Sequence, residues 1–300
     1  MADPTSLWSA LALPAVLVVA AVGTATADAR LGSSQAPAPT REVLRLLVQQ
    51  RRSTSAADQL LLRVGVVLLP VAAVLGAVVV PFGFTSVSDL PDGIVWFNAM
   101  EALAWAAVWL AGWGPNSTLP MIGGYRFLAQ GLAYEIPHML AITTAALGAG
   151  SLRVGAVVDA QSGLWFALWM PVAFAIFLAS ALAMAFWGPF DQPVGTDAAG
   201  GAAAELSGVD RVLFLGGRWL LLTVAAAASV PLFLGGGHGP LLPGWVWTLI
   251  KTATVLALLL WVRRRLPVLR MERYMEVAWV VLTPLAIVQA LVVALVVLGR

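Results

Sequence analysis

The most constraining feature of this sequence is a series of apolar runs, each about 20 residues long, which is the length that crosses a bilayer as a helix. The runs are continuous and do not alternate with polar residues, so they indicate helices and not the strands of a barrel. Apolar residues make up 60% of the 300 residues and charged residues only 11%, whereas a soluble domain has about 25% charged residues. The sequence therefore predicts an all-α polytopic membrane protein that forms one integral membrane domain over residues 1–300.

Eight membrane spans are expected, and the charges between them predict their orientation. With the N-terminus outside, all basic residues except Arg153, Lys251 and Arg300 fall on cytoplasmic loops or their flanks, as the positive-inside rule requires. The first run follows Met-Ala-Asp-Pro without a positive charge, so we expect a retained span and not a cleaved signal. The expected spans are 7–27, 59–81, 93–113, 125–149, 162–187, 210–234, 243–262 and 275–298.

The first cytoplasmic loop contains an amphipathic segment, REVLRLLVQQRR (41–52). Its apolar residues share one broad face, and Glu42 and Arg45 lie on the other. Thr40 is a suitable N-cap for a helix that begins at Arg41. Such a helix lies in the membrane interface. The alternative is a surface helix that merely tethers the first two spans.

The fourth span carries a polar stripe. Ionisable side chains at bilayer depth cost about 2.5–3.5 kcal/mol each, so this face is predicted to contact protein or water. Pro137 cannot donate to the carbonyl of Ala133, which leaves that acceptor free. The stripe consists of Arg126, Gln130, Tyr134 and His138 at steps of four, with Glu135 on the adjoining flank.

This stripe supports two interpretations. One is a proton relay that includes Glu135 and His138. The other is a buried polar cluster that only fixes helix packing, with Glu135 protonated or paired to Arg126. Glu101, in the third span, is a second deep acid, and it is as compatible with a neutral packing carboxyl as with a relay member.

Two further segments hold ionisable residues near the cytoplasmic edge. After the fifth span, two prolines bracket Asp191, and a Gly/Ala-rich stretch follows with Asp197 and Glu205. Composition alone favours a flexible loop with solvated acids here. The segment 261–279 is a basic cluster interrupted by Pro267, typical of an orientation anchor at the lipid headgroups that binds anionic lipid.

Several classes of site are not expected. Without cysteine the chain can form neither a disulfide nor a thiolate-ligated iron–sulfur cluster. The two histidines, His138 and His238, do not suggest a haem or metal site. The GGGHG segment follows a span and not a strand, so it is no nucleotide fingerprint. We therefore expect no cofactor or metal bound by this chain and no nucleic-acid partner.

Several motifs, taken in order from about Pro39 to Pro284, resemble the H subunit (subunit 1) family of NADH–quinone oxidoreductase, complex I. They also resemble the homologous membrane subunit of complex I-like membrane-bound hydrogenases. YRFLAQGLAYEIP is the most specific match. The motifs are APTREVLRLLVQQ (38–50), PFG (81–83), GWGPNS (112–117), YRFLAQGLAYEIP (125–137), GPFDQP (188–193), ELSG (205–208), and Lys251 followed by WVRRRLPVLRMERYM (261–275).

The resemblance implies a membrane-arm core subunit, in a bacterial plasma membrane, that connects a hydrophilic redox arm to a proton-translocating arm. It implies quinone as the substrate of the complex, iron–sulfur clusters and flavin in partner subunits, and no catalysis by the isolated chain. The expected proton path consists of Glu135, Tyr134, His138, Arg126, Gln130 and Glu101. The expected quinone chamber and coupling loop consist of Asp191, Asp197, Glu205, Glu42 and Arg45.

Compared with the family pattern, the chain is a divergent member. Met184 stands where the family has an acid, and VGTDA (194–198) replaces an acidic run and retains only Asp197. An Arg-rich stretch after the first span is replaced by ATADARLGSSQAPAP (25–39).

Two other functions stay open at this point. The depleted loop after the fifth span favours a ferredoxin- or hydrogenase-linked complex in which quinone is not the acceptor. A stand-alone proton-coupled transporter that uses Glu101, Glu135 and Asp191 is the third hypothesis. It is disfavoured because the two halves show no convincing repeat.

Overall fold

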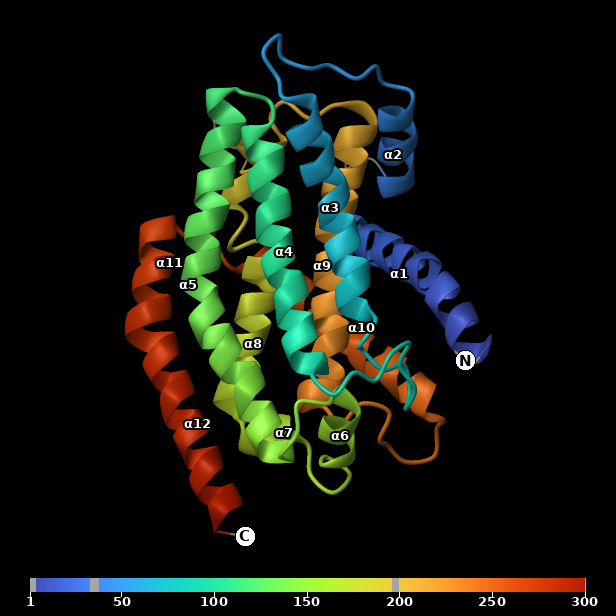
Figure 1. Ribbon diagram of the computed structural model, residues 1–300, viewed down its shortest axis with the longest axis vertical. Helices are drawn as coiled ribbons and strands as arrows, with labels where there is room; N and C mark the ends of the chain where they lie inside the picture. The colour runs from blue at the N-terminus through green and yellow to red at the C-terminus, as the bar shows by residue number, and fades with distance from the viewer. Residues whose placement is uncertain (1–3, 33–37, 196–199, 300) are drawn as a thin grey trace.

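The computed structural model describes residues 4–32, 38–195 and 200–299. Every regular element in these residues is helical, and the only extended pairing among them is an isolated bridge between Phe82 and Thr85. The long helices run side by side along an elongated bundle (Figure 1). We call its two ends the α2 end, which carries α2 (Pro39–Leu47), and the α6 end, which carries α6 (Val154–Asp159).

Six helical stretches in the described residues are long and apolar enough to cross a membrane. They correspond to the first, second, third, sixth, seventh and eighth expected spans, so the prediction of a polytopic all-α membrane protein is confirmed. These helices are α1 (Pro4–Leu31), α3 (Gln59–Ala77), α4 (Gly93–Trp113), α9 (Gly208–Phe233), α10 (Gly244–Arg265), and a rod formed by α11 (Met271–Val277), the π-helical segment η3 (Ala278–Leu282) and α12 (Thr283–Leu298).

The fourth and fifth expected spans differ from these six. The fourth is α5 (Thr118–Ala149), a helix of 32 residues that begins well before the predicted start at 125. The fifth, expected as one helix over 162–187, is divided into α7 (Phe166–Trp169) and α8 (Pro171–Met184). The break is at Met170, with φ −120° and ψ 49°, because a residue before proline is disfavoured in the α region.

The amphipathic segment is shorter than predicted. The helix α2 ends at Leu47, not at 52, and begins at Pro39 after Ala38, so Thr40 is not its N-cap. Pro39 favours this start because its fixed φ suits the first helical turn. Beyond the helix the chain is held by another element, since the backbone N–H of Arg52 donates to Ser207 Oγ at 2.7 Å, next to the start of α9.

The centre of the bundle is α9, which contacts α1, α3, α8 and α10. Glycines allow the closest approaches. A Cβ on Gly65 of α3 would collide with the backbone nitrogen of Ala111 in α4, and such small residues are what bring membrane helices together. α5 packs against α4, α8 and α12. α1 leans away from the other helices and α12 runs along the outside of the bundle (Figure 1).

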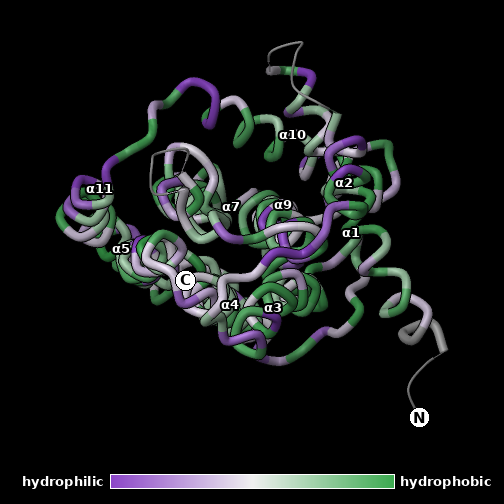
Figure 2. Tube along the Cα trace, turned by 90° about the horizontal axis from the view of Figure 1, so that it is seen from above, coloured by the Kyte–Doolittle hydropathy of each residue, from purple (hydrophilic) through white to green (hydrophobic). Residues whose placement is uncertain are grey.

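Hydrophilic residues are prominent in several of the connections between helices (Figure 2). One hydrophilic stretch runs from the end of α10, at Arg265, through the connection to α11, which contains Arg270. Another is the connection from α8 to α9, which contains the short 3-10 turns η1 (Gln192–Val194) and η2 (Gly201–Ala203) and packs against α5. The α4–α5 interface holds the polar stripe predicted on the fourth span, and the connection from α8 to α9 holds the predicted loop acids Asp191 and Glu205.

Candidate functional site

A buried polar cluster lies between α4 and α5. His138 Nε2 is 2.8 Å from Glu101 Oε2, at ion-pair distance, and the two side chains are 0% and 3% exposed. One residue comes from each helix, so the contact exists only because α4 packs against α5. Glu101 is therefore not an isolated packing carboxyl.

Two further hydrogen bonds extend this cluster along the interface. Asn98 Nδ2 of α4 donates to Glu135 Oε1 at 2.9 Å. Trp105 Nε1 of α4 donates to the Tyr134 hydroxyl at 2.7 Å. Glu135 and Arg126 are nine residues apart on one helix, a rise of about 13.5 Å, so Glu135 takes its partner from α4 and not from Arg126.

Several polar atoms of the cluster are buried without a hydrogen-bond partner among the described residues. They are both carboxylate oxygens of Glu101, both ring nitrogens of His138, Glu135 Oε2 and Asn98 Oδ1. The 2.8 Å contact between Glu101 Oε2 and His138 Nε2 is therefore a charge contact without hydrogen-bond geometry. A carboxyl and an imidazole with free, buried acceptor positions can each accept or release a proton. The arrangement is therefore chemically suited to moving protons over short distances within the bundle.

The other two members of the predicted stripe hold a loop. Gln130 Nε2 donates to the carbonyl oxygens of Ala183 at 2.6 Å and Phe190 at 3.0 Å. Arg126 Nη1 donates to the carbonyl oxygen of Gln192 at 3.3 Å. The stripe is thus packed against protein as expected, but its two halves do different things. Tyr134 and His138 join the acidic cluster, whereas Gln130 and Arg126 position the segment after α8.

A cationic stack beside that segment was not predicted from the sequence. Arg218 of α9 is buried, and its guanidinium carbon is 3.7 Å from the ring centre of Trp187. Arg263 of α10 lies over the same ring at 4.2 Å. Arg218 also donates to the carbonyl oxygens of Ala185 and Phe186. The position of Arg218 inside an apolar run is the signal that could have found it, but the positive-inside rule assigns it only to the flank of a cytoplasmic loop.

The residues predicted for the coupling loop that the structure describes have different neighbours. Asp191 is half-buried and lies near Arg263. Both side chains are close to Gly188, where an added Cβ would be 3.7 Å from Asp191 Oδ2 and 3.3 Å from Arg263 Cγ. Glu205 Oε1 accepts a 3.3 Å hydrogen bond from Ser117 Oγ. Asp197 lies outside the described residues.

Glu42 and Arg45, on α2, form a pair with each other. Arg45 Nη2 is 2.6 Å from Glu42 Oε1, one helical turn away. Hydrogen bonding to the Arg45 guanidinium lowers the pKa of the Glu42 carboxyl below its ordinary value. Both side chains are more than a third exposed, so this pair stabilises α2 only slightly.

At the α6 end a buried lysine holds the loop after α9. Lys251 Nζ donates to the carbonyl oxygens of Leu234 at 2.6 Å, Gly236 at 2.9 Å and His238 at 2.7 Å. The ammonium also lies 4.4 Å from the ring centre of Trp165. All three donor positions of the charge are therefore used, and His238 contributes its backbone and not its imidazole.

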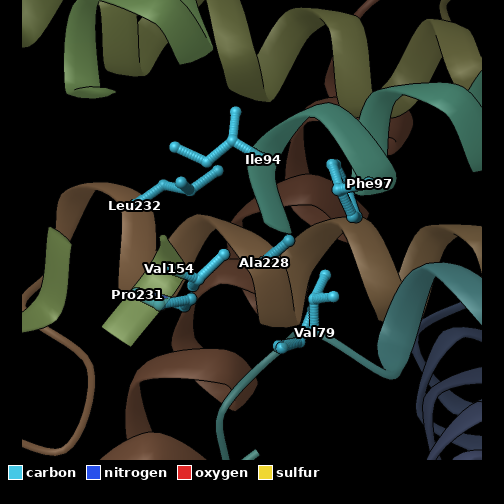
Figure 3. A pocket seen from close by; sticks show the side chains of 8 residues that line it. Val79, Ile94, Phe97, Val154, Ala228, Pro231 and Leu232 are labelled. Carbon is cyan, nitrogen blue, oxygen red and sulfur yellow. The ribbon is translucent and has the colours of Figure 1, made fainter. Parts of the chain in front are cut away.

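Two small crevices adjoin α4 and α9. The first is lined by apolar side chains that converge from α4, α6, α9 and the turn after α3 (Figure 3). The second includes Glu101 and Met184, and Phe97 lines both. No group of three or more His, Asp or Glu side chains in the described part of the chain is arranged to hold a metal ion.

The bundle and its buried acids define a multi-pass membrane protein with ionisable side chains inside its helix packing. A family model described as NADH dehydrogenase matches residues 9–294. The NADH-quinone oxidoreductase H subunit 1 of Geobacter metallireducens is 36% identical over 265 residues, which is 85% of this chain and 80% of that protein. An H subunit 2 of Cereibacter sphaeroides is 38% identical over 262 residues, covering 86% and 82%.

A third relative spans nearly the whole chain. The NADH-quinone oxidoreductase H subunit 1 of Rhodopseudomonas palustris is 32% identical over 311 residues, which is 99% of this chain and 97% of that protein. The chain therefore belongs to the H subunit family of NADH–quinone oxidoreductase, and the resemblance expected from the ordered motifs is confirmed.

Proposed function

We propose that this chain is the membrane-arm core subunit of a complex I-like oxidoreductase, which connects the hydrophilic redox arm to the proton-translocating arm and helps to form the quinone chamber. Family membership supports this reaction class. Electron transfer belongs to the assembled complex, with iron–sulfur clusters and flavin in partner subunits and quinone as the substrate.

The contact of Glu101 with His138 beside Glu135 carries this proposal. Glu101 and His138 are buried, and unpaired charges at this depth are expensive. A cluster of protonatable groups with free acceptor positions is what a proton path needs. Tyr134, Gln130 and Arg126 complete the proposed path toward the segment after α8.

The α2 end is the proposed cytoplasmic side, with the N-terminus outside. The proposed chamber wall is the connection from α8 to α9, with Asp191, Asp197 and Glu205, and with Glu42 and Arg45 at its rim. The basic end of α10 and the connection that follows it are the proposed contact with anionic lipid, because Arg265 and Arg270 are exposed beside Leu266 and Val268.

A second candidate keeps the assembly but not the quinone. Met184, at the end of α8, stands where the family pattern has an acid, and it is buried together with Phe186, Trp187 and Phe190 of the segment that follows. That observation favours a ferredoxin- or hydrogenase-linked complex with another acceptor. Purified complex supplied with NADH or with reduced ferredoxin as the electron donor, each with and without a water-soluble quinone, separates the two. Turnover that requires quinone supports the first candidate, and turnover from reduced ferredoxin without quinone supports the second.

The variant Glu135→Gln tests the proton path. In inverted membrane vesicles that contain the assembled complex, we expect electron transfer to become uncoupled or slowed and the protons translocated per electron pair to fall. Thr144→Val is the matched control, because Thr144 is a buried polar residue on α5 that bonds, among the described residues, to the carbonyl of Leu140 within its own helix. Unchanged proton translocation in Glu135→Gln would assign that residue to packing alone.

The transporter hypothesis has its own test. The purified chain, reconstituted alone in liposomes with an imposed pH gradient, should transport no ion or solute. Solute-dependent proton uptake by the chain alone would replace the proposal of a complex subunit.

A further inference from the structure

We infer that the turn after α3 and the connection from α9 to α10 together form an apolar cap that is inserted into the lipid bilayer instead of lying in water. The apolar cap consists of residues 81–85 and 234–245. Its lipid contact is the boundary between headgroups and acyl chains in the leaflet on the side of the α6 end. The inference requires the membrane assignment of the chain and is independent of the proposed function.

The exposed side chains of the apolar cap are large and apolar. Leu241 is fully exposed at its tip, and Phe82, Phe84, Leu242 and Trp245 are exposed as well. Leu241 also has φ 66°, in the left-handed region that bulky residues rarely adopt. A leucine gains nothing from exposure to water in this conformation, whereas a bilayer would bury its side chain. Exposed apolar surface of this kind marks a contact with a membrane or with another protein.

The two parts of the apolar cap are joined into one surface. The backbone N–H of Gly83 donates to Thr248 Oγ1 of α10 at 3.2 Å. The Phe84 ring lies edge-on to the His238 imidazole, with ring centres 5.1 Å apart. A Cβ on Gly237 would be only 2.9 Å from the carbonyl oxygen of Gly83, so the two backbones are in close contact. The exposed side chains are therefore held in a fixed arrangement.

Most backbone polar groups of the connection from α9 to α10 are satisfied within the chain. Lys251 Nζ donates to three of its carbonyl oxygens. Pro240, which has no N–H, accepts from Trp247 Nε1 at 3.1 Å, and the N–H of Gly235 donates to Gln161 Oε1 at 3.0 Å. The N–H groups that donate to backbone carbonyls are those of Leu234, Gly236, His238 and Leu242. A loop in water can leave these groups to the solvent, but irregular backbone at membrane depth must satisfy them internally.

Charge separates the apolar cap from the rest of the α6 end. The sequence has no Asp, Glu, Lys or Arg between Arg218 and Lys251, and none between Arg63 and Asp89. Directly after the turn, Asp89 forms an exposed ion pair with Arg153 at 2.9 Å. That neighbouring surface has the charges expected of a face in water. The apolar cap has none, which fits a lipid contact, since charged side chains are costly in the bilayer.

The apolar cap continues the lipid-facing surface of the bundle. Trp245, Leu249 and Leu258 are exposed along α10, which is long and apolar enough to cross a membrane. Tryptophan is typical of the membrane–water interface. The end of α12, with Leu295 and Leu298 exposed, extends further along the bundle than the orange connection from α9 to α10 (Figure 1). The apolar cap thus lies at a level where another helix still presents apolar side chains.

The test measures where the tip lies. Leu241→Cys and Phe84→Cys each give the full chain a single site for a nitroxide label, because the chain has no other cysteine. In liposomes of phosphatidylcholine and phosphatidylglycerol, electron paramagnetic resonance reports collisions of the label with oxygen, which concentrates in the bilayer, and with a water-soluble nickel chelate. The control is Ser162→Cys, in the exposed turn after α6 near Asp159. We expect nickel collisions several-fold lower, and oxygen collisions higher, at both cap positions than at the control. Equal nickel collisions at Leu241→Cys and the control would overturn the inference.

The role of Lys251 is tested by adding Lys251→Met to Leu241→Cys. Without the charged donor, three carbonyl oxygens of the connection need water as a partner, so nickel collisions at the label should rise. The same substitution added to Ser162→Cys should leave its collision rates unchanged, because the lost contacts lie within the apolar cap. If nickel collisions at Leu241→Cys do not rise, internal satisfaction of the backbone is not what permits insertion, and that step of the inference fails.

A second measurement needs no variant and uses the assembled complex in its native membrane. A phosphatidylcholine with a photoreactive diazirine near the carbonyl end of one acyl chain is added, and lipid adducts are located by mass spectrometry. We expect adducts within 81–85 or 240–245 and fewer within 159–163. Protein cross-links from these cap residues to a partner subunit, without lipid adducts, would make the apolar cap a protein interface and overturn the inference.

Discussion

The side chain of Arg264, at the end of α10, donates from Nε to Asp28 Oδ1 at 3.0 Å and so joins α10 to the end of α1. Arg263 pairs with the same carboxylate and lies over the Trp187 ring at 4.2 Å. Asp28 is only 7% exposed. Although α1 leans away from the other helices (Figure 1), this carboxylate joins its end to the bundle, in addition to the packing of α1 against α9.

We predict that Asp28→Asn destabilises the chain by on the order of 1–3 kcal/mol, between the values for exposed and buried ion pairs. The reason is that two partly buried guanidinium groups lose their shared counter-charge. Thermal unfolding in detergent would measure this as a lower midpoint. Asp89→Asn is the matched control, because its pair with Arg153 at 2.9 Å is nearly half exposed on both sides. An equal effect in both variants would contradict the role of burial.

Lys251→Met is predicted to destabilise the α6 end by about 3 kcal/mol or more, since three carbonyl oxygens lose a charged donor and each buried unsatisfied group costs about 1–3 kcal/mol. Methionine keeps the approximate volume. Hydrogen exchange should increase first in the loop 234–240. Lys251→Arg should not restore stability, because a planar guanidinium cannot direct its donors as an ammonium does. Unchanged hydrogen exchange of this loop in Lys251→Met would contradict the role of the Lys251 ammonium in holding the three carbonyl oxygens.

Trp187→Leu is predicted to loosen the segment after α8 and to lower stability by about 1–3 kcal/mol, because two cation–π contacts of roughly 0.5–2 kcal/mol each disappear. Limited proteolysis of the segment 185–195 would detect the change. Trp219→Leu is the control. Its ring centre is 4.2 Å from that of Trp187, with the two rings tilted by 47°, but its removal leaves both contacts between Trp187 and the arginines. Equal rates of proteolysis in both variants would mean that the contacts of Arg218 and Arg263 with the Trp187 ring do not stabilise this segment.

Met184→Glu tests the relation between Met184 and Glu101. The family pattern has an acid at the position of Met184, and in this fold Met184 and Glu101 line one crevice. We expect Met184→Glu alone to reduce assembly, because it places a second carboxyl in an apolar space beside the first. Combined with Glu101→Gln it should assemble better than alone. If the combination is no better, the two positions are not alternative places for one acid.

The sequence alone was enough to predict the membrane solvent, the helical class and most span positions. The runs that became α4 and α9 are apolar along most of their length, and in hydrocarbon such a run satisfies its own backbone only as a helix. The prediction failed where local chemistry interrupts a run. Met170 before Pro171 breaks the fifth span, and the docking of Arg52 on Ser207 accompanies the early end of the amphipathic helix.

The pairing of Glu101 with His138 could not be predicted, because periodicity assigns a face to each residue but no partner on another helix. The same is true of Asn98 with Glu135 and of Arg218 with Trp187. Each contact depends on how far one helix is shifted and turned against its neighbour, which small residues such as Gly65 decide through backbone approach.

By itself, then, the sequence determined that this chain is a multi-pass helical membrane protein and which few ionisable residues lie at depth, because transfer into hydrocarbon is governed by the composition of each segment. Only the tertiary structure decided which of those residues lie together. Glu101 contacts His138 and lies beside Glu135, whereas Gln130 and Arg126 contact the segment after α8. Such contacts form between elements that are separated in the chain, so the sequence of one element does not determine them.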